Sequence, residues 1–335
     1  MKEITSLRVH KALGVQLETL PSPVPANGEV VIHSHYSSIN YKDALAVTGR
    51  GEILKELPMT PGIDVAGEIL LSNDSRFNVG DTVLVTGCGL GERFDGGYSE
   101  QVKVAADFVI PCPDGLTARE AMIIGTAGFT AALAIHRMEE NHQSPADGPI
   151  AVTGASGGVG SMAINMLASR DYEVTAISGK AVAFDYLKKL GASEIITREQ
   201  FDLGQRPLEK ARWAGAIDNV GGEMLAGLTR LIQPRGNIAS VGLAGGYELH
   251  TTVMPFILRG INLLGINSVD CPMALRKQLW TQLAGELKPQ ALEQIVSQEL
   301  SLPEVATYCE SMTNGSTSGR ALINLRNEDS ITSRF

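Results

Sequence analysis

The sequence predicts an α/β protein in which a small β-barrel is followed by a doubly wound parallel sheet. Over the first 115 residues, short runs rich in β-branched residues are bounded by Gly, Pro and Asn, as at residues 29–33, 64–70 and 81–85. From Ile150 onward, strand-like and helical segments alternate, which is the order that the βαβ units of a parallel sheet produce. Two domains also fit a chain of 335 residues, at roughly 150 residues per domain.

The second predicted domain contains six strands separated by helices. One of these helices is expected over Val182–Leu190, because Gly191 follows it as a typical C-terminal cap. Six strands that alternate with helices indicate a doubly wound sheet with parallel neighbours. The expected strands cover residues 150–153, 173–178, 194–196, 215–218, 237–242 and 262–266.

Near the C-terminus the sequence returns to short strand-like pieces. Residues 321–325, Ala-Leu-Ile-Asn-Leu, form one such piece. We expect this part of the chain to rejoin the first domain. The predicted first domain therefore comprises residues 1–120 completed by 299–335, and the predicted second domain comprises residues 121–298.

Composition excludes several classes of protein. Hydrophobic residues make up 44% of the chain and charged residues 19%, which is incompatible with a disordered or fibrous protein. The net charge is −9 and no run of Lys and Arg stands out, so we expect no nucleic-acid surface. No apolar signal-peptide core is present at the start, and the uncharged stretch Ala121–His136 is shorter than the roughly 20 residues of a membrane span. We therefore expect a cytoplasmic protein that does not bind membranes.

The four cysteines, Cys88, Cys112, Cys271 and Cys309, are scattered along the chain. None of them forms a C-x-x-C pair with another. A disulfide framework and a structural zinc site are therefore not expected.

The sharpest motif is the glycine-rich segment Gly154–Gly160, with the sequence GASGGVG. It follows the predicted strand at residues 150–153 and precedes an apolar helical run at residues 161–167. Glycines allow a tight turn here, and the N-terminus of the helix offers N–H donors and a positive dipole to a pyrophosphate. The segment therefore predicts a dinucleotide-binding turn, although its spacing is G-x-x-G-x-x-G. The alternative is a glycine-rich turn that only packs the helix on the strand.

The end of the second strand of this domain indicates which nicotinamide cofactor is used. An NAD site would place an Asp or Glu there to accept hydrogen bonds from the ribose hydroxyls, but this chain reads Ser178-Gly179-Lys180. A hydroxyl and an ammonium suit the 2′-phosphate of NADPH, and Arg198 could add a second cation. We expect NADPH. The alternative is that Lys180 is solvated and that the protein does not distinguish the two cofactors.

The predicted barrel, the glycine-rich crossover Gly125–Gly128 and the dinucleotide turn together resemble the medium-chain dehydrogenase/reductase superfamily, over nearly the whole chain. Residues 38–45, 61–67, 213–218 and 252–259 are similar to its zinc-free, quinone oxidoreductase-like branch, which includes NADPH-dependent acrylyl-CoA reductases. The resemblance implies a GroES-like β-barrel domain and a Rossmann domain. It also implies a homodimer, through edge-strand pairing of two nucleotide-binding domains.

The resemblance also bears on metal binding. Zinc-dependent relatives hold a catalytic metal with a Cys in the segment that matches residues 40–43 and with a His in a Gly-His-Glu triplet. This chain reads Asn-Tyr-Lys-Asp at residues 40–43 and Gly-Ile-Asp at residues 62–64, and the four-cysteine lobe of those relatives is missing too. Without these ligands the chain offers no site for a Lewis-acid metal. We expect a protein that needs no metal.

For a zinc-free member, the resemblance implies reduction of a polarised carbon–carbon double bond. NADPH donates hydride to the β-carbon of an enone or enoyl thioester, and negative charge develops on the carbonyl oxygen. The expected reaction is reduction of a short 2-enoyl thioester, acrylyl-CoA to propanoyl-CoA. The alternatives are an NADPH:quinone or small-enone oxidoreductase and an NADPH-binding protein that has lost catalysis.

The resemblance further implies a set of site residues. Tyr41 is expected near the nicotinamide, as proton donor or carbonyl partner; alternatively, Asn40 and Tyr41 only shape the pocket and water supplies the proton. The pyrophosphate, the adenosine 2′-phosphate and the cleft lining are assigned to other residues. These cofactor-binding positions are Ser156, Gly157, Gly158 and Val159 for the pyrophosphate, Ser178, Gly179, Lys180 and Arg198 for the 2′-phosphate, and Leu243, Ile257, Ser268 and Asn314 for the cleft.

Three further charged residues, Asp43, Arg259 and Arg320, each allow two interpretations. Asp43 precedes the run Ala-Leu-Ala-Val and suits the start of a helix, so a capping role is an alternative to a chemical one. Arg259 and Arg320 are expected to have surface or interface roles, with binding of a thioester phosphate as the alternative.

Overall fold

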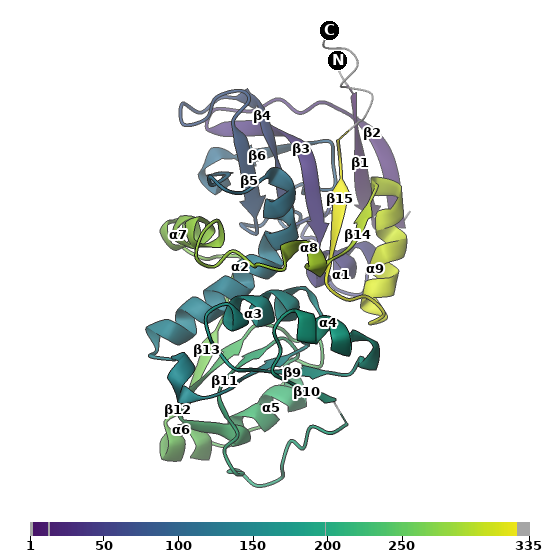
Figure 1. Ribbon diagram of the computed structural model, residues 1–335. Coiled ribbons are helices and arrows are strands. Elements are labelled where there is room, and N and C mark those ends of the chain that lie inside the picture. Colours follow the sequence, from purple (N-terminus) through teal and green to yellow (C-terminus); the bar gives the residue numbers. More distant parts are fainter. Residues whose placement is uncertain (1–2, 13, 198, 327–335) are drawn as a thin grey trace. The chain divides into compact units, whose positions relative to one another are not determined.

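The computed structural model describes residues 3–12, 14–197 and 199–326, which divide into two compact units (Figure 1). The division follows the contacts that the chain makes with itself, so each unit combines segments that are distant in sequence. The first unit combines Met1–Thr126, Val269–Ala284 and Val296–Phe335, and the second combines Ala127–Ser268 with Gly285–Ile295. Residues 269–284, which the sequence placed in the nucleotide-binding domain, thus group with the first unit.

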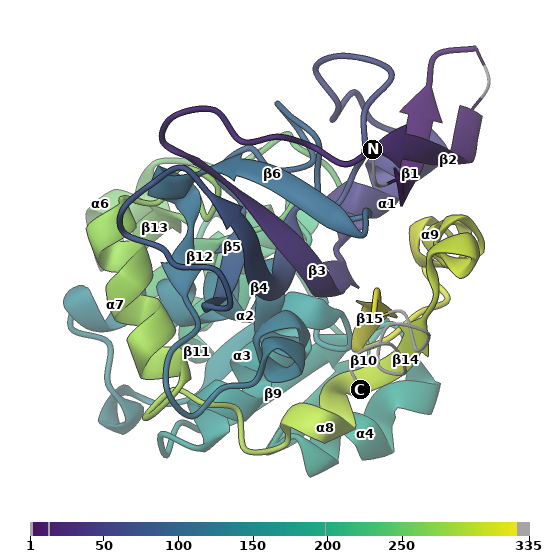
Figure 2. The same cartoon turned by 90° about the horizontal axis from the view of Figure 1, so that it is seen from above.

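The first unit is built on a seven-stranded sheet with the order β14-β15-β3-β4-β5-β7 and with β6 paired to β3. At its centre, β3 (Glu29–Ile39) pairs antiparallel with β15 (Arg320–Asn324), β4 (Asp64–Ser72) and β6 (Gln101–Ala105). Figure 2 shows β3, β4, β5 and β6 side by side. The remaining strands of this unit are β5 (Thr82–Thr86), β7 (Ile110–Pro111), β14 (Val296–Leu300) and a separate antiparallel pair, β1 (Glu3–His10) and β2 (Gly14–Pro21).

The core of this sheet comes from alternating residues of its strands. Val30 and Ile32 of β3, Val65 of β4, and Val83 and Val85 of β5 belong to one apolar cluster and are fully buried. Because successive side chains of a strand point to opposite faces, the alternation gives the sheet one continuous apolar face. The β-branched runs of the sequence are therefore the strands that close around this core.

In the part of the chain that the structure describes, four α-helices lie wholly or partly in the first unit. α1 (Tyr41–Thr48) follows β3 directly and shares an apolar cluster with α9 (Val305–Thr313), through Ala44, Val47 and Val305 among others. α7 is Met273–Leu283, and α2 is Ala118–Glu140, which passes from the first unit into the second. α2 is long and apolar enough to cross a membrane by composition alone, but its apolar window is 89% buried, as in a core helix.

The second unit contains a six-stranded sheet with the order β10-β9-β8-β11-β12-β13, in which all pairs are parallel. This confirms the predicted doubly wound sheet. The helices of this unit are α3 (Gly158–Ala168), α4 (Phe184–Lys189), α5 (Gly222–Leu231), α6 (Met254–Arg259) and α8 (Leu292–Ile295). The strands are β8 (Ile150–Thr153), β9 (Val174–Ser178), β10 (Glu194–Thr197), β11 (Trp213–Asp218), β12 (Ile232–Ser240) and β13 (Asn262–Gly265).

Two elements of the second unit differ from their predicted form. The helix expected over Val182–Leu190 is a short 3₁₀ turn followed by α4, only six residues long. β12 begins at Ile232, before the predicted start at residue 237, because the chain pairs with β11 on both sides of an irregularity. Arg235 has a φ of 68° within it, and a Cβ at Gly236 would lie 2.2 Å from the carbonyl oxygen of Ala214. The Pro-Arg-Gly sequence at this bulge is typical of a turn, so the first half of the strand was not predicted.

Candidate active site

The glycine-rich turn of the second unit joins the buried strand β8 to α3. Gly154 has a φ of 58°, in the left-handed region that favours glycine, and Gly157 is the N-cap residue of α3. A Cβ at Gly160 would lie 2.5 Å from the carbonyl oxygen of Gly154. Glycine is therefore required at position 160 for the helix to start so close to the strand.

This turn lies where the order of the sheet reverses. From β8 the chain proceeds outward through β9 and β10, and it then returns to β11 on the other side of β8. Ligands of doubly wound sheets bind at the carboxyl ends of the strands at this reversal. The 11-residue helix α3 directs its first backbone N–H groups toward that end. A short glycine turn, a helix N-terminus and a switch in strand order together fit the pyrophosphate of a dinucleotide.

Asp218 connects the carboxyl ends of β8 and β11, a role that its sequence did not indicate. Its buried carboxylate accepts hydrogen bonds from the hydroxyl of Thr153 at 2.6 Å and from the backbone N–H of Gly221 at 2.8 Å. Burial raises its pKa, while these hydrogen bonds act in the opposite direction. Asp218 thus ties the end of β8 to the turn between β11 and α5. Its only signal in the sequence was its place at the end of a predicted strand.

The residues assigned to the 2′-phosphate follow β9. The side chain of Ser178 is buried, and its hydroxyl accepts a hydrogen bond from the backbone N–H of Lys180 at 3.2 Å. Lys180 is partly buried, and this burial lowers its pKa. Gly179 is exposed between them. Arg198, the second predicted cation, lies outside the described residues.

The other predicted residues are divided between the two units. Leu243 and Ile257 are 62% and 72% exposed in the second unit, where Ser268 is the last residue before the chain enters the first unit. Tyr41 and Asn314 belong to the first unit. Asn314 follows α9, and its side-chain oxygen accepts a hydrogen bond from Nη1 of Arg50 at 2.8 Å.

Tyr41 is the first residue of α1 and is 42% exposed. The preceding residue, Asn40, caps this helix together with Asp43, whose Oδ2 accepts from the Asn40 backbone N–H at 2.9 Å. Asp43 Oδ1 accepts from the backbone N–H of Ile63, also at 2.9 Å. Asp43 therefore has the capping role that its sequence suggested, and it joins the start of α1 to the segment before β4. The ammonium of Lys42 pairs with Glu92 at 2.9 Å.

Asn40, the residue before Tyr41, contacts a buried ion pair between Asp64 and Arg320. Both side chains are buried, and Nη2 of Arg320 lies 3.6 Å from Oδ2 of Asp64. The same Asp64 oxygen accepts hydrogen bonds from Ser38 at 2.6 Å and from Asn40 Nδ2 at 2.8 Å. The hydroxyl of Thr126 donates to the other Asp64 oxygen at 2.6 Å. Three hydrogen-bonding residues and the Arg320 guanidinium thus surround a carboxylate that has no access to solvent.

This ion pair fixes Asn40 from both ends of its amide. Nδ2 donates to Asp64, and Oδ1 accepts from Nη1 of Arg320 at 2.8 Å. An amide held by an anion on one side and a cation on the other has one orientation. Since Asn40 directly precedes Tyr41, the buried pair determines where Tyr41 starts α1.

Gly125 is essential to this arrangement. It interrupts α2 with φ 48° and ψ −159°, so that the backbone N–H of Thr126 leaves the helix and donates to Asp64. A Cβ at Gly125 would lie 2.6 Å from both Nη2 of Arg320 and Oδ2 of Asp64. Only glycine allows α2 to pass this close to the ion pair.

Arg320 was expected at the surface or in an interface, and this expectation is wrong. It is 2% exposed and donates from Nε to the carbonyl oxygen of Ile123 at 3.1 Å, besides its contacts to Asn40 and Asp64. Arg259 also has a structural role. Its Nη1 donates to the carbonyl oxygens of Arg230 and Ile232 at 2.8 and 3.0 Å.

The Asp64 network occupies the region that matches the metal ligands of zinc-dependent relatives. Asp64 and Ile63 stand where those relatives have the last two residues of a Gly-His-Glu triplet. Among residues 3–12, 14–197 and 199–326, no three His, Cys, Asp or Glu side chains gather as a metal-binding group. The carboxylate of Asp64 is instead bound by side chains of the protein.

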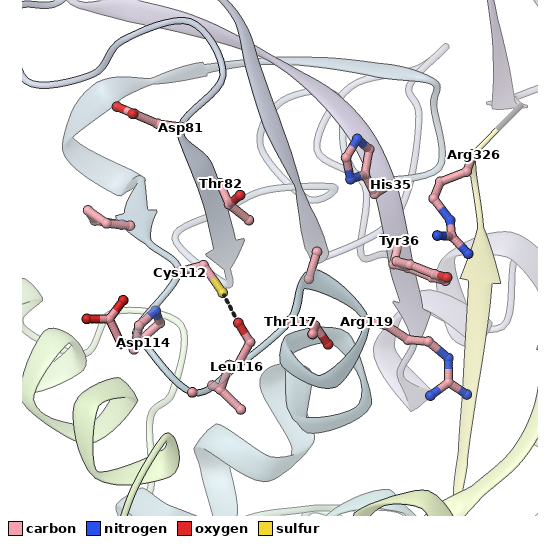
Figure 3. Close-up of a pocket in the computed structure, with 14 residues that line it drawn as sticks. His35, Tyr36, Asp81, Thr82, Cys112, Asp114, Leu116, Thr117, Arg119 and Arg326 are labelled. Carbon is pink, nitrogen blue, oxygen red and sulfur yellow. Dashed lines mark hydrogen bonds between the residues drawn. The ribbon is translucent and has the colours of Figure 1, made fainter. Parts of the chain in front are cut away.

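A hollow of about 930 Å³ in the first unit is separate from this network. It lies beside β3 and the start of α2, and its labelled lining includes His35, Tyr36, Arg119 and Arg326 (Figure 3). None of the predicted catalytic or cofactor-binding residues lines it. We therefore do not assign it to the candidate active site.

Titration of Asp43 offers a test of the buried network. Burial and the neighbouring Asp64 carboxylate raise the pKa of Asp43 from 3.8 to about 7. Between these pH values the folded protein keeps a proton that the unfolded chain has lost, so the free energy of unfolding falls as the pH rises from about 4 to about 7. In Asp43→Asn this fall should be smaller by up to about 1.4 kcal/mol per pH unit, the slope for one proton.

The measurement is urea unfolding of both proteins at pH 5, 6 and 7, in a Trp213→Phe background. The fluorescence of Trp280, in α7, then reports the first unit alone. Asp114→Asn, which removes an exposed carboxylate of the same unit, is the control and should leave the slope unchanged. Equal pH slopes in wild type and Asp43→Asn would contradict the assignment.

Comparison with known proteins places the chain in a family. Residues 26–114 match the family "Alcohol dehydrogenase GroES-like domain", and residues 158–285 match "Zinc-binding dehydrogenase". The chain is 47% identical over 307 residues to the probable acrylyl-CoA reductase AcuI of Escherichia coli, covering 92% of this chain and 94% of that protein. It is also 47% identical over 315 residues to the putative quinone oxidoreductase YhfP of Bacillus subtilis, covering 93% and 95%.

Solved structures agree with this placement. The yhdH oxidoreductase of Salmonella enterica in complex with NADP is 42% identical, with a TM-score of 0.91, and the match covers 96% of this chain and all of that one. Bacillus subtilis yhfP with NAD bound is 44% identical, with a TM-score of 0.92, over 97% of this chain and all of that one. The expected GroES-like and Rossmann domains are thus confirmed. The chain belongs to the medium-chain dehydrogenase/reductase superfamily, in its quinone oxidoreductase-like branch of nicotinamide-dependent oxidoreductases.

Proposed function

We propose that the protein reduces the carbon–carbon double bond of a short 2-enoyl thioester with NADPH, converting acrylyl-CoA to propanoyl-CoA. The observation that carries this proposal is the buried Asp64–Arg320 pair, which fixes the amide of Asn40 directly before Tyr41. The proposed chemistry uses a nicotinamide cofactor and positioned side chains. The similarity to a probable acrylyl-CoA reductase supports the choice of substrate.

The second unit offers residues suited to NADPH. The turn at Gly154–Gly160 suits the pyrophosphate, and the hydroxyl of Ser178 and the ammonium of Lys180 suit a 2′-phosphate. In the sequence, Gly179 and Lys180 stand where an NAD site would have a carboxylate. The NADP complex of the Salmonella relative supports this choice. When bound, the nicotinamide supplies the hydride that is added to the β-carbon of the substrate.

The first unit supplies the remaining groups. Reduction adds a proton at the α-carbon, and negative charge develops on the thioester oxygen before that proton arrives. Tyr41 is 42% exposed and begins α1 directly after Asn40, whose amide is held by Asp64 and Arg320. We assign to the Tyr41 hydroxyl the donation of a hydrogen bond to that oxygen or of the proton itself. Asp43 and Asp64 position Asn40 and do not themselves contact the substrate.

A second candidate function is reduction of quinones or small enones on the same site. The similarity to a putative quinone oxidoreductase, at the same identity, favours it. A quinone accepts hydride without a thioester, so the two functions differ in what the pocket must recognise. The third possibility, an NADPH-binding protein without catalysis, would bind NADPH and turn over neither class.

Oxidation of NADPH, followed at 340 nm, distinguishes these functions. Acrylyl-CoA, crotonyl-CoA and a benzoquinone are compared under the same conditions, with NADH as the control cofactor. The proposal expects turnover of acrylyl-CoA well above that of the other two. Turnover of the quinone alone would show that the substrate is not a thioester. Absence of turnover with all three substrates would favour an NADPH-binding protein without catalysis.

Lys180→Ala tests the cofactor assignment. Hydrogen bonds to charged groups contribute about 1.5–3 kcal/mol, so the KM for NADPH should rise about tenfold or more, whereas the KM for NADH should change little. Lys188→Ala, which removes an exposed ammonium of the neighbouring α4, is the matched control. Equal changes in both KM values would show that Lys180 does not bind the 2′-phosphate.

Tyr41→Phe separates a chemical role from packing. Loss of the hydroxyl should lower kcat by about 10²-fold if it acts in the reaction, while the KM for NADPH stays nearly constant. Tyr247→Phe, at a tyrosine that is 83% exposed, removes a hydroxyl elsewhere and serves as the control. An unchanged kcat in Tyr41→Phe would show that Tyr41 only shapes the pocket and that water is the proton source.

We also propose that two copies associate through the second unit. β13 is an edge strand of the parallel sheet, and the nearby segment from Tyr247 to Leu258 exposes large apolar side chains, Val253 at 67% and Leu258 at 62%. Exposed apolar patches of this kind mark interaction surfaces. Light scattering should give twice the mass of one chain, and a monomer at all concentrations would refute the pairing.

A further inference from the structure

Asn219 lies in the turn after β11 and connects this turn to the end of β8. Its backbone N–H donates to the hydroxyl of Thr153 at 3.0 Å, and its side-chain Nδ2 donates to the carbonyl oxygen of Thr153 at 2.8 Å. Because a carbonyl oxygen only accepts hydrogen bonds, the group of the side-chain amide that faces it is the NH₂. The orientation of the amide is therefore fixed, and its carbonyl oxygen, Oδ1, is left for a different partner.

Oδ1 of Asn219 is a buried acceptor that receives no hydrogen bond from any residue in the described part of the chain. Native proteins leave few buried polar atoms unpaired, because such an atom loses its hydrogen bonds to water without replacement. Asn219 as a whole is partly exposed, so the residue lies at the surface of the second unit and not in its core. An orphaned acceptor at this position fits a donor that comes from a ligand or from water.

Asn219 is next to the dinucleotide turn. Gly154, the first glycine of that turn, directly follows Thr153, and a Cβ at this glycine would lie 3.2 Å from Cβ of Asn219. β8 and β11 are adjacent strands at the point where the strand order reverses. Asn219 thus follows the carboxyl end of β11, at the crevice in which doubly wound sheets bind their ligands.

The two halves of a dinucleotide extend from this turn in opposite directions. Ser178 and Lys180, which suit the adenosine 2′-phosphate, follow β9 on one side of β8. The half that carries the nicotinamide then extends over β11, on the side of Asn219. An ionised pyrophosphate has no hydrogen-bond donor, and the first donors beyond it in this half are the hydroxyls of the second ribose. These hydroxyls match the acceptor that Asn219 offers.

We propose that Oδ1 of Asn219 accepts a hydrogen bond from a hydroxyl of the nicotinamide-bearing ribose, so that Asn219 binds the half of the cofactor opposite to the 2′-phosphate. Nδ2 holds the amide on the end of β8, and glycine at position 154 leaves room beside it. Because the second ribose is common to NADPH and NADH, this contact adds affinity without distinguishing the two cofactors. The inference rests on the use of a nicotinamide cofactor in the proposed function, whereas it does not depend on the thioester substrate.

Binding of cofactor fragments to the full chain, measured by isothermal titration calorimetry without substrate, tests this contact. NADPH and 2′-phospho-ADP-ribose contain the second ribose, whereas adenosine 2′,5′-bisphosphate lacks it. In Asn219→Ala the Kd of the first two ligands should rise about fivefold, the effect of one hydrogen bond, and the Kd of the third should not change. NADH should lose affinity by the same factor as NADPH, unlike in Lys180→Ala. Gln205→Ala, which removes an exposed amide of the same unit, is the control and should change no Kd.

Two results in Asn219→Ala would overturn the proposal. Unchanged affinity for all ligands would show that water satisfies Oδ1. An equal loss of affinity for adenosine 2′,5′-bisphosphate would show that Asn219 acts only by holding the turn through Thr153.

A second measurement uses the wild type and does not depend on the folding of a variant. NADPH is compared with two analogues, in which the nicotinamide-bearing ribose lacks its 2′- or its 3′-hydroxyl. One analogue should bind the wild type about fivefold more weakly than NADPH, and this difference should disappear in Asn219→Ala. Equal binding of NADPH and both analogues to the wild type would overturn the contact. If acrylyl-CoA is not turned over, the proposed function fails, while these affinities still decide the role of Asn219.

Discussion

The buried pair of Asp64 and Arg320 is the interaction on which the rest of the first unit depends. Moving an isolated ion into a protein interior costs several kcal/mol, so each of these charges needs the other and needs further hydrogen bonds. Ser38, Asn40 and Thr126 supply them. Four parts of the chain therefore meet at one point, because each brings one of these charges or a partner for them. They are the end of β3, the start of β4, the kink of α2 and the start of β15. Removing one partner would leave the other ion buried and unpaired.

The local parts of the fold and of the site could be predicted from the sequence. The dinucleotide turn depends on a strand, a set of glycines and a helix that are consecutive in the chain, and each has its own pattern. The six parallel strands were found for the same reason, since β-branched runs mark them one by one. The early start of β12 was missed because Pro234, Arg235 and Gly236 are typical of a turn, whereas here they form a bulge beside β11. Only the pairing with Trp213 shows that the strand has already begun.

The buried half of the site could not be predicted, because its partners are far apart in sequence. Arg320 donates to Ile123, 197 positions away, and to Asn40, 280 positions away. An isolated arginine after a polar loop has the same local pattern as a surface arginine, so the sequence favoured the wrong environment. Gly125 was a partial indication, in the sequence, that other groups approach α2 closely. A glycine in the middle of an apolar helix suggests a close approach of other groups, but it does not say which groups approach.

The proton on Asp43 links this network to the proposed chemistry. Asp43 and Asp64 are two carboxylates near one guanidinium, so the cluster carries a net charge of −1 when both are ionised and is neutral when Asp43 is protonated. Reduction of an enoyl thioester builds negative charge on the carbonyl oxygen, and an extra buried anion at the start of α1 would oppose it. A pKa raised to about 7 keeps a substantial fraction of Asp43 neutral near physiological pH. The second carboxylate can then cap α1 as a hydrogen-bonding group while adding little charge to the site.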